Sequence, residues 1–166
     1  MNKLTDQESL SLEQRLSLVY LGSTHKSTQV HEMVIAALED AGPHAPPLQR
    51  LRAIVPQGRE ALLRGDFEAF GRAMIANYEA QRALHPALIS SSAERVVEIA
   101  RSYGALGWKV NGAGGEGGSL TLLSGPRRDE QRAMLAEIMA ENPDARLIPI
   151  RLSLTGVQVW RTHGLW

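Results

Sequence analysis

The sequence has no cysteine among its 166 residues, which excludes disulfides, thiolate nucleophiles and cysteine-ligated metals. It also lacks an excess of either charge, because 18 Lys and Arg residues balance 18 Asp and Glu residues. No long-range field therefore favours nucleic acid or an anionic membrane surface. No apolar run approaches the length of a membrane span, and the polar start, Met1–Asp6, lacks the apolar segment of a signal peptide. We expect a cytoplasmic protein that binds neither nucleic acid nor membranes.

The histidines show no spacing typical of metal ligands. His31 is followed by Glu32, but no second histidine stands four residues after His31, so the zinc-protease pattern fails. We therefore expect no metal site. A chain of this length, with 43% hydrophobic residues, is long enough for one domain and too short for two ordinary ones, so we predict a single domain over residues 1–166.

Hydrophobic periodicity predicts a mixed order of strands and helices. The order begins with a strand, continues through several helices to two strands, and ends with a helix and further strands. The expected elements are a short helix or lead-in over 3–14, a strand over 15–22, helices over 29–40, 48–63, 67–84 and 93–103, strands over 107–111 and 119–123, a helix over 127–141, and strands over 145–150 and 151–162. Pro56 is expected to break or kink its helix. The order is that of a split β-α-β-β-α-β unit with extra helices inserted after the first strand, so we predict an α+β, ferredoxin-like fold.

A glycine-rich stretch stands between the two central strands. Five glycines and an alanine fall within residues 112–118. Such density favours unusual backbone angles or a close approach to another group, and free N–H groups in such a turn can bind an anion. The alternative is a flexible linker, which usually has polar flanks, whereas both flanks here are apolar and strand-like. The pattern therefore favours an ordered loop.

The surroundings of these glycines resemble a known motif. The stretch 105–118 resembles the third, C-terminal motif of the GHMP kinases, a family that includes galactokinase, homoserine kinase, mevalonate kinase and the heptose phosphate kinases. That motif has a lysine on a strand, then Gly-Ala-Gly-Gly-Gly-Gly and a further apolar strand, and Lys109 and residues 112–115 match it. The sequence departs from the motif at Glu116, where the family has glycine, and at Gly118, where it often has a cysteine or an aromatic residue.

The resemblance covers nearly the whole chain but only the second half of the family's proteins. It implies the C-terminal, acceptor-side domain of an ATP-dependent kinase, of the sugar or sugar phosphate type, that transfers phosphate to a hydroxyl group. The family's ATP-binding motif belongs to the N-terminal half and has no counterpart here. The resemblance therefore implies that ATP and Mg²⁺ serve only the complete kinase and that this chain alone binds neither. It implies an N-terminal kinase half as partner, with a homo-oligomer as the alternative, and an isolated chain that is inactive.

The resemblance also implies which residues lie near the substrate or the phosphates, although it assigns none of them a catalytic role. They are Lys109, Asn111, Gly112, Ala113, Gly114, Gly115 and Gly117 in the motif, and His25, Lys26 and Ser27 in the loop after the first strand. The loop is not a Walker A sequence, and its residues have an equally good interpretation as turn and helix-capping chemistry. Lys109 is either a cation facing the cleft or a lysine on an exposed strand face, and Asn111 is also a common turn residue.

A different class of function stays open. A split β-α-β-β-α-β fold also serves as a non-enzymatic small-molecule-binding or dimerisation domain, because a fold alone does not fix a function. Glu116 favours this alternative, since its carboxylate would repel phosphates at close range.

Overall fold

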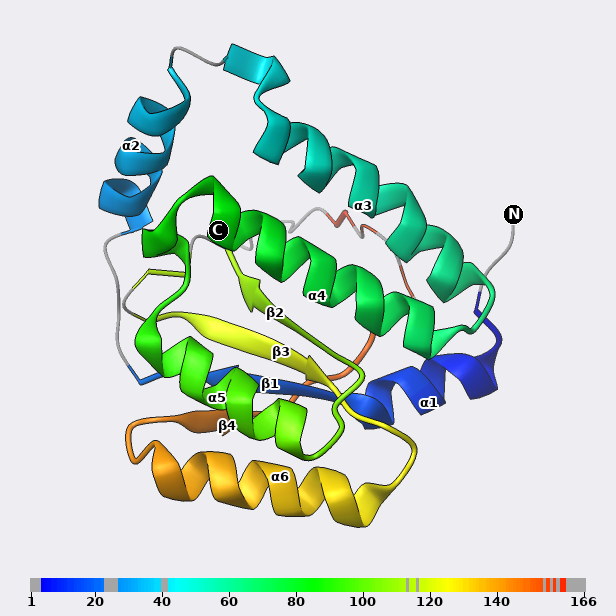
Figure 1. Ribbon diagram of the computed structural model, residues 1–166. Helices are drawn as coiled ribbons and strands as arrows, with labels where there is room; N and C mark the ends of the chain where they lie inside the picture. Colours follow the sequence, from blue (N-terminus) through cyan, green and yellow to red (C-terminus); the bar gives the residue numbers. More distant parts are fainter. Residues whose placement is uncertain are drawn as a thin grey trace, which may run out of the picture.

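The structure is built on a four-stranded antiparallel sheet in the order β2-β3-β1-β4 (Figure 1). It is a computed structural model that describes residues 4–22, 27–39, 42–112, 114–115, 117–153, 155, 157 and 159–160. The strands are β1 (Leu16–Tyr20), β2 (Gly107–Asn111), β3 (Ser119–Leu123) and β4 (Arg146–Ile148). This strand order belongs to the split β-α-β-β-α-β unit, so the predicted α+β, ferredoxin-like fold is confirmed.

Helices account for most of the remaining described residues, and four α-helices separate β1 from β2. They are α1 (Asp6–Arg15), α2 (Ser27–Leu38), α3 (Pro46–Leu63), α4 (Phe67–Leu84), α5 (Ser91–Ser102) and α6 (Arg128–Glu141), with 3-10 turns η1 (Gly42–His44) and η2 (Pro86–Leu88). The helix starts follow from local capping. The Asp66 carboxylate accepts the Ala69 N–H at 2.8 Å, and the Ser90 hydroxyl accepts the Ala93 N–H at 3.1 Å.

The main core lies between one face of the sheet and helices α5 and α6. Val19, Val110 and Leu120 point from three neighbouring strands into this layer, where each is at most 1% exposed. Val96 from α5 and Ile138 from α6 are fully buried opposite them. Because side chains alternate along a strand, the residues between these buried positions face the other side of the sheet. On that other side, Leu123 packs with Leu12 of α1 and with Phe67 and Met74 of α4.

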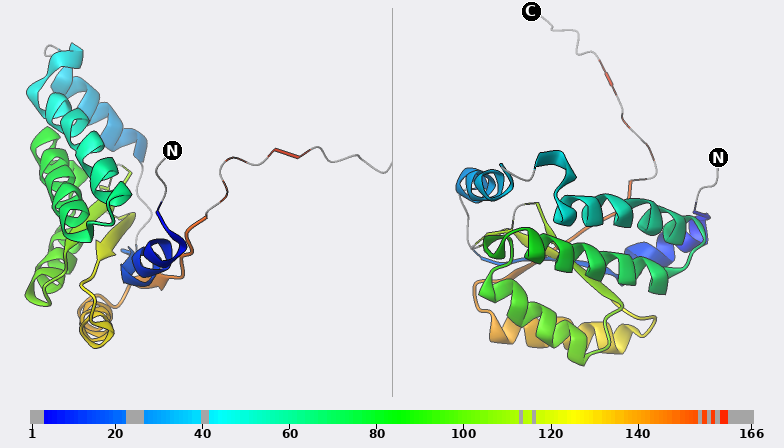
Figure 2. Two further views of the ribbon diagram at one scale, coloured as in Figure 1. Left: turned by 90° about the vertical axis from the view of Figure 1, so that its right-hand side faces the viewer. Right: turned by 45° about the horizontal axis from the view of Figure 1, so that its top comes forward.

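Helix α4 lies against the edge strand β2, and α3 packs on α4 from outside (Figures 1 and 2). A Cβ atom added to Gly71 of α4 would collide with the carbonyl oxygen of Leu106, and one added to Gly107 of β2 would lie 2.6 Å from the Cα of Gly71. The two backbones therefore touch with no side chain between them. This contact fixes the side chains of α4 relative to those of β2.

Two expectations differ from the structure. Helix α3 continues through Pro56, so of the expected break or kink the break does not occur. The expected strands over 145–150 and 151–162 reduce to β4, which pairs with β1 over three residues only. Pro149 follows directly, and it lacks the N–H that a further ladder bond requires. No strand occurs among residues 149–153, 155, 157 and 159–160. The Leu152 N–H donates to Glu13 of α1 at 2.8 Å, and the described residues beyond Ser153 lead away from the sheet (Figure 2).

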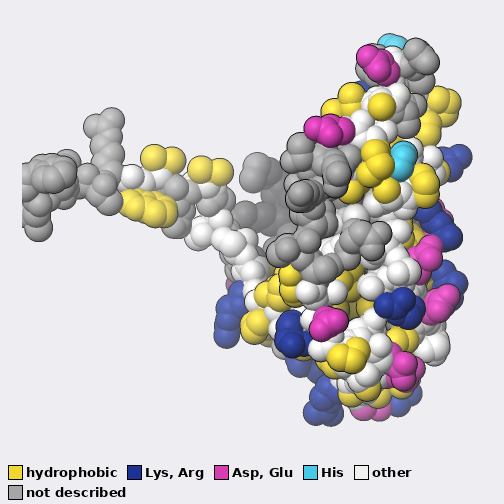
Figure 3. All heavy atoms as spheres, turned by 90° about the vertical axis from the view of Figure 1, so that its left-hand side faces the viewer, with side chains coloured by type: hydrophobic (Ala, Val, Ile, Leu, Met, Phe, Trp, Pro, Cys, Tyr) yellow, Lys and Arg dark blue, Asp and Glu magenta, His cyan; other side chains and the backbone are white. Residues whose placement is uncertain are grey.

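The described part of the C-terminal stretch exposes large apolar side chains, which Figure 3 shows on the projecting segment. Val157 is 97% exposed and Val159 is 88% exposed. Among the helices within the described ranges, none is both long and apolar enough to cross a membrane.

Candidate functional site

The glycine-rich stretch joins β2 to β3 as a tight, packed loop. Gly112, Gly114, Gly115 and Gly118 have φ values of +66°, +62°, +66° and +83°, a region that side-chain-bearing residues rarely adopt. Gly114, Gly115 and Gly117 are buried. The loop is fixed at both ends, because the Gln81 side chain donates to the Gly112 carbonyl at 3.2 Å and the Leu21 N–H donates to the Gly118 carbonyl at 2.9 Å. These contacts are those of an ordered loop rather than of a linker.

Substitutions in this loop should separate backbone strain from crowding. A Cβ atom at Gly114 would collide with the Leu88 carbonyl oxygen and lie 2.8 Å from Val110 Cγ1, whereas one at Gly112 would meet nothing within 4 Å. Gly112→Ala is therefore expected to cost only the strain of a positive φ, about 1–2 kcal/mol. Gly114→Ala adds a collision with the backbone to that strain and should lose about 2–4 kcal/mol of unfolding free energy.

Urea denaturation measures both losses, and Gly125→Ala is the matched control. Gly125 has no positive φ and nothing within 4 Å of an added Cβ, so the change there should stay within about 0.5 kcal/mol. Equal stability of the Gly112 and Gly114 variants would show that the contact with Leu88 does not constrain the loop.

A row of polar side chains lies beside the loop on the sheet face opposite α5 and α6. Lys109 is paired in register with Thr121, and Asn111 is paired with Ser119. The Asn111 amide donates to the hydroxyls of Ser119 at 3.1 Å and Thr121 at 3.0 Å, and the Thr121 hydroxyl donates to Asn111 Oδ1 at 3.1 Å. Asn111 is therefore a cross-strand bridge in the sheet and not a turn residue.

Lys109 supplies a cation to this row. Its side chain is partly buried, and the ammonium donates to the carbonyl of Val110 at 2.8 Å. No ion pair of Lys109 occurs within the part of the chain that the structure describes. Burial lowers the pKa of Lys109 below its usual value of 10.5, because the apolar surroundings disfavour the charged form.

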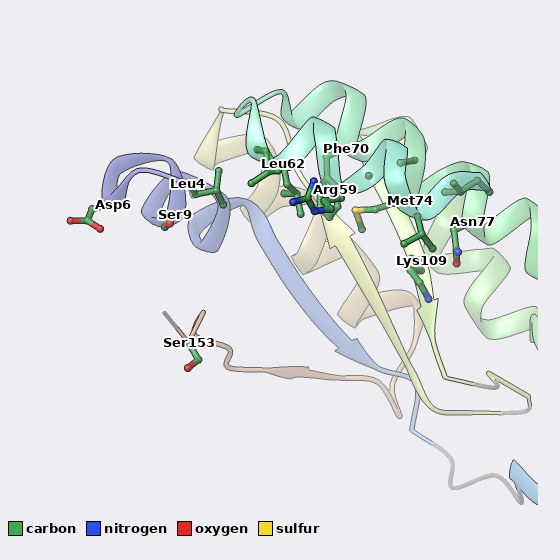
Figure 4. Close-up of a pocket in the computed structure, with 15 residues that line it drawn as sticks. Leu4, Asp6, Ser9, Arg59, Leu62, Phe70, Met74, Asn77, Lys109 and Ser153 are labelled. Carbon is green, nitrogen blue, oxygen red and sulfur yellow. The ribbon is translucent and has the colours of Figure 1, made fainter. Parts of the chain in front are cut away.

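Lys109 also lines a groove of about 790 Å³. We call it the α3–α4 groove, because helices α3 and α4 form its wall (Figure 4). Most of its lining is apolar. Residues of α1 and Ser153 line the other sides of the groove. The lining residues are Leu4, Asp6, Ser9, Ile54, Val55, Gly58, Arg59, Leu62, Leu63, Phe70, Ala73, Met74, Asn77, Lys109 and Ser153. Its size lies within the range of about 300–1,000 Å³ that is usual for ligand pockets.

One polar group of this groove has no partner among the residues that the structure describes. Asn77 Oδ1 is buried and accepts no hydrogen bond from them, although buried amide oxygens normally do. Asn77 and Lys109 both line this groove (Figure 4). Sequence reasoning missed Asn77. The available signal was a polar residue between Met74 and Tyr78 on the apolar face of α4.

Replacing Lys109 by methionine tests whether the folded protein disfavours the lysine ammonium. We expect this change to raise Tm at neutral pH. The native fold disfavours the Lys109 ammonium, as its lowered pKa shows, so an uncharged side chain of similar length removes that penalty. Because Lys109 is only partly buried, the expected rise is small, roughly 2 °C.

The pH dependence that Lys109 gives to the unfolding free energy has a definite sign. Between the lowered folded pKa and the usual value of 10.5, the unfolded chain binds more protons than the folded one, so wild-type stability rises with pH in that window. The Lys109→Met variant should lack this rise. Thermal melts of both proteins at neutral pH and near pH 10 measure it; a methionine variant less stable than wild type at neutral pH would contradict the expected penalty.

Some predicted site residues cannot be placed. His25, Lys26 and Ala113 lie outside the described residues, as does Glu116. Ser27 begins α2, and its role remains a prediction. The structure brings Lys109 and Asn111 together on one face next to Gly112, and it places Gly114, Gly115 and Gly117 in the packed loop. No group of three or more potential metal-ligating His, Asp or Glu residues occurs within the described ranges.

Comparison with known proteins assigns the family. A family model described as GHMP kinases C terminal matches residues 59–144, which include α4, α5, the glycine loop and α6. The chain belongs to this family of kinase C-terminal domains. It is 31% identical over 150 residues to "L-fucokinase/L-fucose-1-P guanylyltransferase" of Bacteroides fragilis, a match that covers 87% of this chain and 15% of the relative. It is 29% identical over 131 residues to "Bifunctional fucokinase/GDP-fucose pyrophosphorylase" of Arabidopsis thaliana, covering 78% of this chain and 12% of the relative.

Solved structures show the same fold. Mevalonate kinase of L. major, in complex with R-mevalonate, superimposes with a TM-score of 0.66 at 29% identity, over 78% of this chain and 39% of that one. The Lin0012 protein of Listeria innocua superimposes with a TM-score of 0.72 at 18% identity, over 81% of this chain and 38% of that one. The chain therefore spans well under half the length of the proteins that it matches.

Proposed function

We propose that this chain is the acceptor-side part of a kinase that phosphorylates a hydroxyl group of a sugar, and that L-fucose is the acceptor. GHMP kinases generally use ATP, and both curated relatives carry fucokinase in their names. The observation that carries the proposal is the position of Lys109 and Asn111. Both side chains lie on one sheet face, between the α3–α4 groove and the glycine loop.

The proposed division of labour follows from the chemistry of phosphoryl transfer. This reaction needs positioning of the acceptor and stabilisation of negative charge more than covalent chemistry from the protein. In the proposed arrangement, the sheet face with Lys109 forms one wall of the acceptor site. The glycine loop packs near the phosphates, toward which its backbone N–H groups can turn. An N-terminal half supplies the ATP and Mg²⁺ sites, and His25, Lys26 and Ser27 face the same site.

We also propose that residues 1–166 form a single domain and that the complete kinase is cytoplasmic. A non-enzymatic binding domain is the alternative. It rests on Glu116, which lies outside the described residues.

The test is a chimaera in which this chain replaces the matched segment of the Bacteroides fragilis relative. The chimaera should phosphorylate L-fucose in preference to R-mevalonate or a heptose phosphate. The intact relative and a version without the segment are the two controls. Preference for another acceptor would contradict L-fucose, and a chimaera as inactive as the deletion, although folded, would favour the binding-domain alternative.

A further inference from the structure

Helix α4 runs alongside β2 and reaches the glycine loop where that strand ends (Figure 1). The backbone of Gly71 contacts that of Gly107 at the start of β2, and the Gln81 side chain reaches Gly112 just beyond its end. The helix rises about 15 Å between Gly71 and Gln81, and the strand advances about 17 Å between Gly107 and Gly112. The two elements therefore stay aligned along the whole of β2, and this alignment brings Gln81 to the loop.

Gln81 holds the start of the loop through a hydrogen bond. Its side-chain amide donates to the Gly112 carbonyl at 3.2 Å. A Cβ atom added to Gly112 would meet nothing within 4 Å, whereas one added to Gly114 would collide with the Leu88 carbonyl oxygen. The middle of the loop is therefore held by packing, while its start is held by the hydrogen bond from Gln81.

This hydrogen bond contributes little to the stability of the fold. It is exposed to solvent, so its loss on unfolding is largely compensated by hydrogen bonds to water. The oxygen of the same amide, Gln81 Oε1, is buried and accepts no hydrogen bond from the described residues, which is unfavourable. The Gln81 side chain therefore does more for the position of the loop than for the free energy of unfolding.

The orientation of the Gly112 carbonyl matters if the loop receives an anion. The N–H groups of such a turn attract an anion, whereas a carbonyl oxygen turned toward it would repel it. Glycine peptide groups rotate easily, because no Cβ atom restricts the backbone angles. The hydrogen bond from Gln81 keeps the Gly112 carbonyl turned toward α4 and opposes this rotation.

We propose that Gln81 is a positioning residue for phosphoryl transfer, because it holds the Gly112 carbonyl toward α4 and thereby keeps the glycine loop in the conformation that receives phosphate oxygens. The inference rests on the proposed function and adds to it a residue outside the glycine motif. Gln81 acts through the loop and does not itself contact the phosphates.

The first experiment measures backbone hydrogen exchange in the isolated chain. Gln81→Met has a side chain of similar length and removes the donor, so exchange over residues 112–118 should become about three- to tenfold faster. Tm should stay within about 2 °C of wild type, because the lost hydrogen bond is exposed. Gln81→Lys supplies a donor again and should restore the slower exchange.

The matched control is Gln49→Met, which makes the same chemical change at another glutamine. Gln49 is exposed on α3, and its side chain is hydrogen-bonded to His44 rather than to the loop. Its replacement should leave exchange over residues 112–118 unchanged.

The second experiment measures kinetics in the chimaera with the Bacteroides fragilis relative. A loop whose first peptide group can rotate stabilises the charge of the transferred phosphate less well, so Gln81→Met should lower kcat about tenfold. KM for the acceptor should change by less than about twofold, since Gln81 does not line the α3–α4 groove. A merely structural role would not produce this division between kcat and KM.

The two experiments fail in distinguishable ways. Unchanged exchange over residues 112–118 or unchanged kcat in Gln81→Met would overturn the positioning role, as would an equal effect of Gln49→Met. A raised KM with unchanged kcat would also overturn it, because Gln81 would then act on acceptor binding. An inactive wild-type chimaera would count against the proposed function, whereas the exchange measurement needs no turnover and still decides whether Gln81 holds the loop.

Discussion

Gly71→Ala is expected to destabilise the fold strongly, because the added methyl group has no room between α4 and β2. Its Cβ would collide with the Leu106 carbonyl oxygen and lie 2.6 Å from the Leu106 carbonyl carbon, and both atoms belong to the backbone. They cannot rotate away as a side chain can, so α4 must separate from β2. We expect a loss of about 3 kcal/mol or more, which is a large fraction of the 5–15 kcal/mol that usually stabilises a domain.

A glycine-to-alanine substitution in the neighbouring helix α3 should change the unfolding free energy in the opposite direction. Gly58 lies inside α3, and an added Cβ there would be 3.6 Å from Ala73 Cβ, an ordinary contact. Gly58→Ala should therefore stabilise the fold by about 0.5–1 kcal/mol through the higher helix propensity of alanine. Urea denaturation of the two variants compares them directly. Similar unfolding free energies would contradict the direct backbone contact between α4 and β2.

The elements with strong local signals were predictable from the sequence. Helix α4 spans Phe67–Leu84 as predicted, because Asp66 caps its start and His85-Pro86 ends it. Strands β2 and β3 have the predicted bounds, because alternating apolar residues stop at the glycine loop on both sides. In each case the residues that end the element are its immediate neighbours in sequence.

Elements that depend on a distant partner were not predictable in the same way. The stretch after Ile148 alternates apolar and polar residues as a strand does, but β1 pairs only with the three residues before it, Arg146–Ile148. Alternation shows that a segment suits a sheet edge without showing that an edge is available. In the proposed complete kinase, the N-terminal half would be one source of such an edge.

The candidate site also combines a feature that the local sequence predicts with one that depends on distant contacts. Alternation along β2 predicted that Lys109 faces away from Trp108 and Val110, and the structure agrees. The place of Asn77 in the same groove as Lys109 depends on the contact between Gly71 and β2, which joins segments about 35 residues apart. No local pattern carries that information.

We expect phosphoryl transfer by this chain to require a second kinase half. This prediction has the largest expected effect on activity. The chain lacks the family's ATP-binding motif. It covers 39% of the L. major kinase and 15% of the Bacteroides fragilis relative. The α3–α4 groove and the exposed C-terminal stretch leave apolar surface uncovered. Such surface favours association with another chain. Phosphoryl transfer needs the groups that hold ATP and the metal, so the chain alone should fold without catalysing it.

The most direct measurement is the rate at which phosphorylated L-fucose forms from ATP, with this chain alone and with it joined to the remaining part of the Bacteroides fragilis relative. We predict no turnover above background for the chain alone and turnover in the joined protein, with Gly114→Val abolishing the latter. Robust phosphorylation by the isolated chain would contradict the proposed dependence on a second half.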